Sequence, residues 1–453
     1  MKIGTAISIL VLAATAWWGT AWAAPATAAT SAPKTGSRTV ITIATYGDIT
    51  VAKDAWDDIK ATFEAQHPEY ELRYTIIPYS DYITKLTTLL ATDQAPDVFQ
   101  TWAQYKPRWV SDGILLDVTD FVAKSKVLRP TEFFPVALEC AKFNGRFYGT
   151  PHDFNSEVYY FNVDLADEAG VPVPDNDWTI RDLETVATKI SRPDKGVFGT
   201  SNPIYWGGGL QWVYNFSGHY WLTDNNQRAT VADPKVIDMV KYWERLTYDL
   251  RVTPSSLLPM QPGKDEFAGY VGAWLGWVAY MDQLSQFEQK AQAAGHKFWN
   301  WTMLPYPAGP AAQRNFAQGH MWSISARNPH PERAFVLAEW LSGYEGQKVW
   351  AKHHAFQPLG PNQELWSIYL GFLPQSKRQQ VAAFLLGSLY AKYALNFTYW
   401  PTYPEMQDIW TRAMSDVFAS RKSPDTVLAN ANRLMDAVLA RQQQQKASPE
   451  KNG

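Results

Sequence analysis

Apolar and polar positions along residues 40–91 switch between two periods. Residues 40–45 and 72–77 carry the alternating and β-branched side chains of strands, whereas 55–66 and 82–91 have the spacing of amphipathic helices. The order is therefore strand, helix, strand, helix. Such alternation predicts an α/β fold with a mainly parallel sheet and helices on both of its faces.

A stretch in the middle of the chain joins a turn to a strand. Residues 148–162 start with a Gly-x-Pro turn, pass through polar residues, and end in a run of β-branched and aromatic side chains at 158–161. That run has the composition of a buried strand. Asp153 and Asn155 stand at the strand entrance, where they either form an Asx-turn or face a ligand.

The remainder of the chain keeps this mixed pattern. Helices are expected at 164–169, 182–190, 233–249, 334–341, a segment ending near 420, and 424–441, and extended segments at 267–277, 303–307 and 318–326. Thr179 and Asp182 are spaced as a capping box, and Asp233 followed by proline marks another helix start. The glycine-rich and aromatic segment 202–221 lacks the Lys-Ser/Thr of a phosphate-binding loop.

Composition excludes one class of partner. The chain has 453 residues, 46% of them hydrophobic, and a formal net charge of -3. This length is sufficient for two domains with large cores. No basic stripe of the kind that phosphate contacts require is present, so no nucleic-acid partner is expected.

The N-terminus has the features of a secretory signal. A basic start precedes an apolar run at 7–18 and the small-x-small site Ala21-Trp22-Ala23. The run is shorter than the ~20 residues that span a bilayer. Residues 1–23 are therefore predicted to be a cleaved signal peptide and 24–38 a flexible leader. No cysteine lies near the cleavage site, so we expect a free periplasmic protein rather than a lipoprotein.

Cys140 is the one cysteine of the chain, so no internal disulfide can form. Apolar residues flank it on both sides, and we expect a small buried residue rather than a nucleophile.

Several blocks of the sequence resemble, in the same order, the extracellular carbohydrate-binding proteins that feed ABC transporters, the maltose-binding-protein-like class. The blocks are Ala95-Pro-Asp-Val98, residues 148–162, Gly218 to Asp224 with the following Asp233-Pro helix, Phe267-x-Gly to Gly276-Trp277, and Gly319-x-x-Trp322-Ser-Ile followed by Asn328-Pro-x-x-Glu-Arg-Ala334. Two departures stand out. Tyr46 occupies a position where the family often has Trp, and Gln318-Gly319-His320 replaces a Gly-Gly pair, which adds an imidazole.

The resemblance implies a periplasmic-binding-protein type II-like fold, with two α/β lobes joined by crossing segments and a ligand cleft between them. The N-terminal lobe would comprise 39–152 plus about 320–360, and the C-terminal lobe 153–319 plus about 361–441, followed by a disordered tail at 442–453.

A sugar site needs flat aromatic faces for the apolar side of a pyranose and polar side chains for its hydroxyls. The chain holds 21 Trp and 23 Tyr, many of them beside glycines or at predicted strand ends. The expected stacking platforms are Trp102, Trp206 and Trp277, and the rim residues are Tyr46, Tyr79, Tyr205 and Tyr403. Each of these rings could instead pack in the core.

The polar ligand-binding candidates lie in the same blocks. They are Asp48, Asp81, Asp153, Asn155 and His320, together with the backbone at Gly319. Asp153 and Asn155 form the strongest pair, because they lie on a segment that both lobes would share. Asp81 could instead cap a helix, and His320 could be a structural histidine.

The predicted function is the periplasmic substrate-binding component of an ABC transporter. It would capture a mono- or oligosaccharide, deliver it to the permease in the inner membrane, act as a monomer, and need no cofactor, metal or catalytic residue. One alternative is a binding protein for a polyamine or a glycerol phosphodiester. The other is a secreted glycoside hydrolase, which would need two carboxylates from among Asp97, Asp153 and Glu266. His353 and His354 are adjacent, and that spacing does not favour a metal site.

Overall fold

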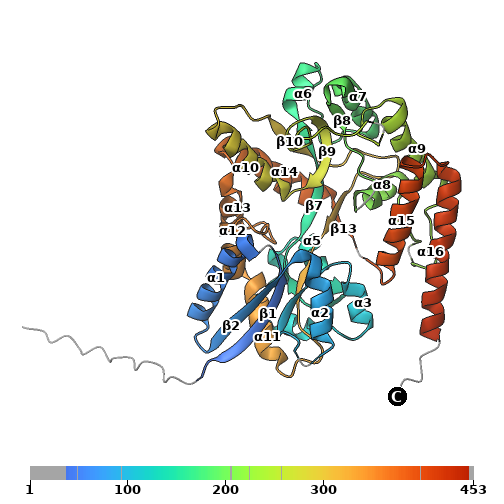
Figure 1. Cartoon of the computed structure of the whole chain (residues 1–453). Helices are drawn as coiled ribbons and strands as arrows, with labels where there is room; N and C mark the ends of the chain where they lie inside the picture. Colours follow the sequence, from blue (N-terminus) through green and yellow to red (C-terminus); the bar gives the residue numbers. More distant parts are fainter. Residues whose placement is uncertain are drawn as a thin grey trace, which may run out of the picture. The chain divides into compact units, whose positions relative to one another are not determined.

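The computed structural model describes residues 37–447, apart from residues 48, 93, 205, 206, 224, 257 and 398. Two sheets organise this part of the chain (Figure 1). The first has the strand order β2-β1-β3-β12-β6. Its strands are β1 (Thr39–Tyr46), β2 (Tyr70–Ile77), β3 (Val98–Thr101), β6 (Thr150–Pro151) and β12 (Met321–Ser323). β1 pairs in parallel with β2 and β3, whereas β12 runs antiparallel to β3 and β6.

Helices connect and cover the strands of the first sheet. They are α1 (Ile49–Gln66), α2 (Tyr82–Leu90), α3 (Lys106–Ser111), α4 (Thr119–Lys124), α5 (Pro135–Cys140), α11 (Pro331–Ser342) and α12 (Tyr344–Lys352). The short hairpin of β4 (Lys142–Phe143) and β5 (Arg146–Phe147) precedes β6.

The second sheet is centred on β7 and has the order β13-β11-β7-β9-β8, with β10 also paired to β7. Its strands are β7 (Asn155–Asn162), β8 (Phe198–Thr200), β9 (Val271–Trp277), β10 (Trp301–Leu304), β11 (Asn315–Gln318) and β13 (Ala394–Asn396). The expectation of mainly parallel sheets is wrong here, because β7 runs antiparallel to β9, β10 and β11. Only the β2-β1-β3 part of the first sheet and the edges of the second are parallel.

Helices also surround the second sheet. They are α6 (Val163–Glu168), α7 (Ile180–Ile190), α8 (Gly207–Ser217), α9 (Pro234–Glu244), α10 (Tyr280–Ala293), α13 (Gln363–Tyr369), α14 (Gln375–Phe384), α15 (Tyr403–Phe418) and α16 (Pro424–Ala447). Two π-helical segments, Arg245–Asp249 and Leu385–Tyr393, extend α9 and α14. Among the described residues, no helix combines the length and the apolar character that crossing a bilayer requires.

Two antiparallel chain segments lead from one sheet into the other. β6 of the first sheet continues into β7 of the second, and β11 of the second continues into β12 of the first. The two segments pair at both ends, through Trp322 with Thr150 and through Gln318 with Asn155. Between these pairs the backbone N–H of His152 donates to the carbonyl of His320 at 3.0 Å. We call residues 150–156 and 317–322 the crossing segments.

Large apolar side chains fill the space around both sheets. Trp56, Trp274, Trp301 and Trp322 are at most 2% exposed. Cys140 is buried, as expected, and burial raises the pKa of its thiol to about 12. It is therefore a packing residue rather than a nucleophile.

Most predicted elements are present, and three differ for local reasons. The strand expected from 267 begins only at Val271, because Gly269 has a φ of 83° and turns the chain. The segment 318–326 is not one strand, since the chain leaves one sheet at Gln318 and enters the other at Met321. α16 continues to Ala447, so residues 442–447 are helical rather than part of a disordered tail.

Helix starts are the best-predicted details. Thr179 and Asp182 form the expected capping box at α7, and the side chain of Asp233 caps α9. The glycine-rich segment supplies α8, which was not expected as a helix. The predicted signal peptide and most of the predicted leader lie outside the described residues.

Candidate functional site

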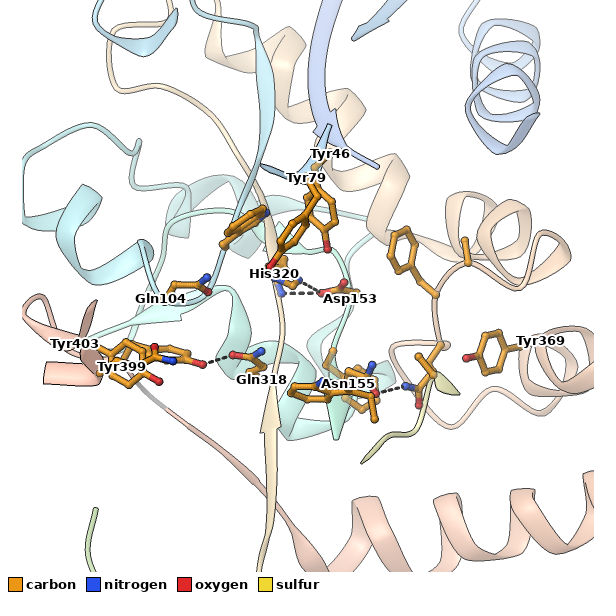
Figure 2. Close-up of a pocket in the computed structure, with 18 residues that line it drawn as sticks. Tyr46, Tyr79, Gln104, Asp153, Asn155, Gln318, His320, Tyr369, Tyr399 and Tyr403 are labelled. Atoms are coloured by element: carbon orange, nitrogen blue, oxygen red, sulfur yellow. Dashed lines mark hydrogen bonds and ion pairs between the residues drawn. The ribbon is translucent and has the colours of Figure 1, made fainter. Parts of the chain in front are cut away.

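A cavity of about 290 Å³ lies where the crossing segments meet the carboxyl ends of β1, β3 and β9. Strand ends of this kind are where α/β proteins usually place ligands. Figure 2 shows the side chains around it. Its lining comprises Tyr46, Tyr79, Trp102, Gln104, Asp153, Phe154, Asn155, Trp277, Ala279, Gln318, His320, Ala355, Phe356, Gln357, Tyr369, Tyr399, Tyr403 and Gln407.

One wall of the cavity is an aromatic cluster from the first sheet. Tyr79 stacks on Trp102 with ring centroids 4.7 Å apart and an interplanar angle of 21°. Tyr46 meets both rings edge-on. Because Trp102 is 7% exposed and Tyr79 is 62% exposed, Tyr79 presents the ring surface that an incoming solute would meet. Trp102, expected as a platform, here supports the ring above it.

The opposite wall comes from the second sheet and the α15 region. Trp277 ends β9 and is half-buried. Tyr403 is 4% exposed and stacks on Trp221 at 5.7 Å with an angle of 5°. Tyr399 packs edge-on against Tyr403 and donates to the side-chain carbonyl of Gln318. Tyr403 therefore reaches the cavity only with a small part of its surface, whereas Trp277 exposes more.

Amide side chains supply most of the remaining polar groups. Gln357 donates to the side-chain carbonyl of Asn155 at 3.1 Å. Asn155 also accepts from the backbone N–H of the next residue, Ser156, at 3.0 Å, whereas an Asx-turn uses the N–H two residues on. The amides of Gln104 and Gln407 have no hydrogen-bond partner among the described residues. Those two amides are available to a solute.

Asp153 lies on the cavity floor between two imidazoles. Its Oδ1 accepts from the backbone N–H of His320 at 2.8 Å and lies 2.7 Å from Nδ1 of the same residue. Its Oδ2 lies 3.3 Å from Nδ1 of His152. Burial alone would raise the pKa of Asp153, but the charge of His320 and the hydrogen bond from its imidazole outweigh burial and hold that pKa well below its usual range. Burial lowers the pKa of His152.

The structure brings eight of the predicted site residues to this cavity, including the pair Asp153 and Asn155 (Figure 2). Asp81 lies away from it, paired with Lys85 at 3.2 Å, and makes no side-chain cap bond to α2. Gly319 does not line it either. A side chain there would meet the carbonyl of Asp153 at 2.0 Å, so the glycine lets the crossing segments approach. Asp48, Tyr205 and Trp206 lie outside the described residues.

The three carboxylates considered for hydrolysis, Asp97, Asp153 and Glu266, do not lie in one site. Asp97 is bonded to Thr42 and Arg333 in the first sheet, at 2.9 and 3.1 Å. Glu266 lines a different hollow, beside Met260 and Tyr248. Among the described residues that line the cavity, Asp153 carries the one carboxylate.

Sequence reasoning missed the wall formed by Ala355, Phe356, Gln357 and Tyr369. These residues follow α12 or belong to α13, and no motif marks them. Gln104 and Gln318 adjoin predicted site residues, so a search for amides beside the aromatic positions could have found them.

Comparisons with known proteins agree with this architecture. The sequence profile of a family described as bacterial extracellular solute-binding protein matches residues 46–348. A Brucella abortus protein named as a binding protein is 22% identical over 405 residues, which cover 85% of this chain and 89% of the relative.

Solved structures are similar over most of their length. An ABC substrate-binding protein from Listeria monocytogenes in complex with cycloalternan has a TM-score of 0.74 and 22% identity, covering 89% of this chain and 99% of that one. The sugar-binding protein MalE from Xanthomonas citri has a TM-score of 0.73 and 20% identity, covering 92% and 100%. These similarities confirm the predicted type II periplasmic-binding-protein fold.

Proposed function

This chain belongs to the family of bacterial extracellular solute-binding proteins, and from that membership we propose that it captures a mono- or oligosaccharide for an ABC transporter. The cavity between the two sheets is the proposed binding site. The solute is then delivered to a permease in the membrane, and no bond of the solute is broken.

The chemistry of the cavity lining carries the proposal. Aromatic rings and uncharged amides dominate it, and the described part of the lining contains no Lys or Arg and one carboxylate. A pyranose offers an apolar C–H face for stacking and a rim of hydroxyls that both donate and accept hydrogen bonds. Aromatic rings and amides match these two features, because an amide side chain also donates and accepts. The similar structures include a protein in complex with cycloalternan and a sugar-binding protein, and both support the same class of solute.

The charge of the lining argues against the alternative solutes. A glycerol phosphodiester is an anion and calls for Arg, Lys or a helix N-terminus. A polyamine is a multiple cation and calls for several acids. Among the described residues of the lining, Asp153 is the one acid that would meet a polyamine, and His320 already pairs with it. A neutral sugar fits the site better than either ion.

The side chains that line the cavity also support binding without hydrolysis. Glycosidases use two carboxyl groups on either side of the scissile bond. In the described lining Asp153 has no second acid beside it, and both of its oxygens face imidazoles. We therefore propose a receptor rather than an enzyme.

Within the site we assign stacking to Tyr79 and Trp277, on opposite walls, and hydroxyl contacts to Gln104, Gln407 and His320. Asp153 acts through His320, which it orients. Asn155 supports Gln357 in the same way. The remaining aromatic residues shape the cavity.

The location and partners of the protein follow from the family and from the predicted signal peptide. Family membership makes it an extracellular binding protein. We propose export through a cleaved signal, residence in the periplasm as a monomer, and docking on permease subunits after the two lobes close. Closure around the solute is the usual motion of such receptors.

Thermal unfolding against a panel of sugars tests the proposal. Neutral mono- and oligosaccharides are compared with the phosphorylated form of the same sugar and with spermidine, and each sugar is recovered and checked for cleavage. A ligand at 100 times its dissociation constant adds about 2.7 kcal/mol of stability. A rise in melting temperature with an intact neutral sugar supports the proposal. A response to the phosphorylated sugar or spermidine alone, or cleavage of the sugar, contradicts it.

A further inference from the structure

Two histidines from different crossing segments aim the same ring atom at one carboxylate. Nδ1 of His320 lies 2.7 Å from Oδ1 of Asp153, and Nδ1 of His152 lies 3.3 Å from Oδ2 (Figure 2 shows the Asp153–His320 contacts). One donor atom from each of the three residues lies within 4.8 Å of the other two. His152 and Asp153 are consecutive, and His320 joins them only because the crossing segments run side by side.

The hydrogen bonds of Gln100 indicate which atom of His152 carries its proton. The Thr45 hydroxyl donates to Oε1 of Gln100 at 2.9 Å, so the NH₂ group of that amide faces Nδ1 of His152, at 3.4 Å. A donor in front of Nδ1 requires a lone pair there. The proton then sits on Nε2, which is buried without a hydrogen-bond partner among the described residues.

This tautomer leaves two electron-rich atoms facing each other. The Nδ1 lone pair of His152 and the Oδ2 of Asp153 are 3.3 Å apart in a buried place, with no hydrogen atom between them. Such a contact is repulsive unless a cation shares the two atoms. His320 presents a third ligand atom to the same carboxylate.

We propose that His152, Asp153 and His320 form a binding site for a divalent transition-metal ion of the Zn²⁺ class on the floor of the cavity. Two imidazole nitrogens and one carboxylate are a common ligand set for Zn²⁺ and for iron, and they leave coordination positions open. Mg²⁺ and Ca²⁺ prefer all-oxygen ligands and would not be selected here. The proposal goes beyond sugar capture, because the site needs no sugar to form.

Burial decides where the open positions would point. The side chain of His152 is fully buried, and it packs against Trp322 with ring centroids 4.0 Å apart. Asp153 and His320 are 13% and 18% exposed and line the cavity. A bound ion would therefore face the cavity, where water or an oxygen atom of the solute could complete its coordination. It would also join the two crossing segments.

Calorimetric titration with the metal alone tests the proposal. The exported chain is prepared without a histidine tag, stripped with a chelator, and titrated with Zn²⁺ and separately with Ca²⁺. We expect one Zn²⁺ per chain, a higher melting temperature with Zn²⁺, and no binding of Ca²⁺. Co²⁺ in place of Zn²⁺ should give the visible absorption bands of a four- or five-coordinate ion.

Variants assign the ion to these residues. His320→Ala should weaken Zn²⁺ binding at least tenfold. His353→Ala is the matched control, since His353 also pairs with a carboxylate, that of Asp58 at 2.8 Å. The neighbouring His354 faces the carbonyl of Tyr369 instead, so a second imidazole does not share that carboxylate. The affinity of His353→Ala for Zn²⁺ should equal that of the wild type. If His320→Ala does not fold, a second comparison replaces it. The Co²⁺ absorption bands of the wild type should then be lost in Asp153→Asn.

Absence of stoichiometric Zn²⁺ binding by the wild type would overturn the proposal, as would binding that His320→Ala leaves unchanged. In either case the three residues form only a hydrogen-bonded group. Because the titration contains no sugar, its failure leaves sugar capture untouched. Conversely, a sugar panel run in chelator tests sugar capture without the ion.

Discussion

Tyr79 and Trp102 both belong to the aromatic wall of the cavity, but they differ in how much surface reaches solvent. Tyr79 is 62% exposed and Trp102 is 7% exposed beneath it. An exposed ring contributes to ligand contact more than to the core, whereas a buried ring contributes mainly to folding. The two positions should therefore respond differently to truncation.

Replacing Tyr79 with Ala is predicted to weaken sugar binding by about 1 kcal/mol, roughly fivefold, with little loss of stability. Trp102→Ala should instead lower the free energy of unfolding by about 3–5 kcal/mol. Calorimetry and urea unfolding measure the two effects. Phe287→Ala is the control, because Phe287 is an exposed ring, at 44%, on α10 away from the cavity. Equal affinities for Tyr79→Ala and Phe287→Ala would remove Tyr79 from the site.

Glu157 is a buried acid in β7. It is 4% exposed, accepts from the Tyr306 hydroxyl, and forms no ion pair with a described Lys or Arg. Burial raises its pKa from 4.5 to about 7, although the bond from Tyr306 acts in the opposite direction. Between pH 4.5 and 7 the folded protein therefore holds a proton that the unfolded chain has released.

Stability should fall over that pH range. The contribution of Glu157 is complete below pH 4.5 and is lost as the pH rises through 7, a difference of about 3 kcal/mol. Glu157→Gln, which still accepts from Tyr306, should remove this dependence and be more stable than the wild type at pH 8. Urea unfolding at pH 5 and pH 8 measures the difference. The exposed Glu345→Gln is the control, and equal pH dependences in all three proteins would contradict the account.

At the scale of elements, the close approach of the two crossing segments requires a glycine at position 319. A Cβ at this position would lie 2.0 Å from the carbonyl of Asp153 and 2.7 Å from Sγ of Cys140. Both neighbours are buried or belong to the backbone, so neither can easily move aside. The glycine is thus a condition for the contact between Asp153 and His320.

Gly319→Ala is predicted to lower the free energy of unfolding by about 1–3 kcal/mol, the usual cost of overpacking. Gly387→Ala supplies the contrast. Nothing lies within 4 Å of a Cβ there, and Gly387 sits in a helical segment. Since alanine favours helices, that variant should be neutral or more stable. Denaturant unfolding of both variants measures these changes in stability. An unchanged midpoint for Gly319→Ala would mean that the crossing segments can move apart freely.

Local sequence signals predicted the starts of helices well. The features that depend on tertiary contacts could not be predicted from them. The capping box of Thr179 and Asp182 and the cap at Asp233 need only neighbouring residues, so the sequence was enough. The sequence does not reveal that the chain changes sheet at Gly319 and His320, because only the tertiary pairing shows that the partner strand changes from β7 to β3. Propensity also disfavours α8, which begins with glycines, so packing must hold it.

For the whole molecule, the cavity gathers residues from Tyr46 to Gln407. The sequence suggested five of the aromatic members, because rings of this kind recur at predicted strand ends or beside glycines. They are Tyr46, Tyr79, Trp102, Trp277 and Tyr403. The sequence contains no signal for Phe356, Gln357 or Tyr369, whose position depends on how the α12–α13 region packs. It also placed Trp102 as an open platform, since the covering ring of Tyr79 could not be foreseen.

Closure of the two lobes is the predicted motion of the whole chain. If the proposed lobes rotate about the crossing segments, a sugar that contacts both walls should draw them together. Small-angle scattering should then show a smaller radius of gyration at saturating sugar than without it. An unchanged radius, with binding confirmed in the same sample, would mean that the solute enters a cavity that does not close.

The most direct test of the central claim is the affinity of the wild type and of Trp277→Ala for the best sugar in the panel, measured by calorimetry. Trp299→Ala is the matched control, since this half-buried tryptophan does not line the cavity. We predict one neutral sugar per wild-type chain, at least fivefold weaker binding by Trp277→Ala, and unchanged binding by Trp299→Ala. Equal affinities in all three proteins, or no neutral sugar that binds the wild type, would contradict the claim that this cavity is a sugar site.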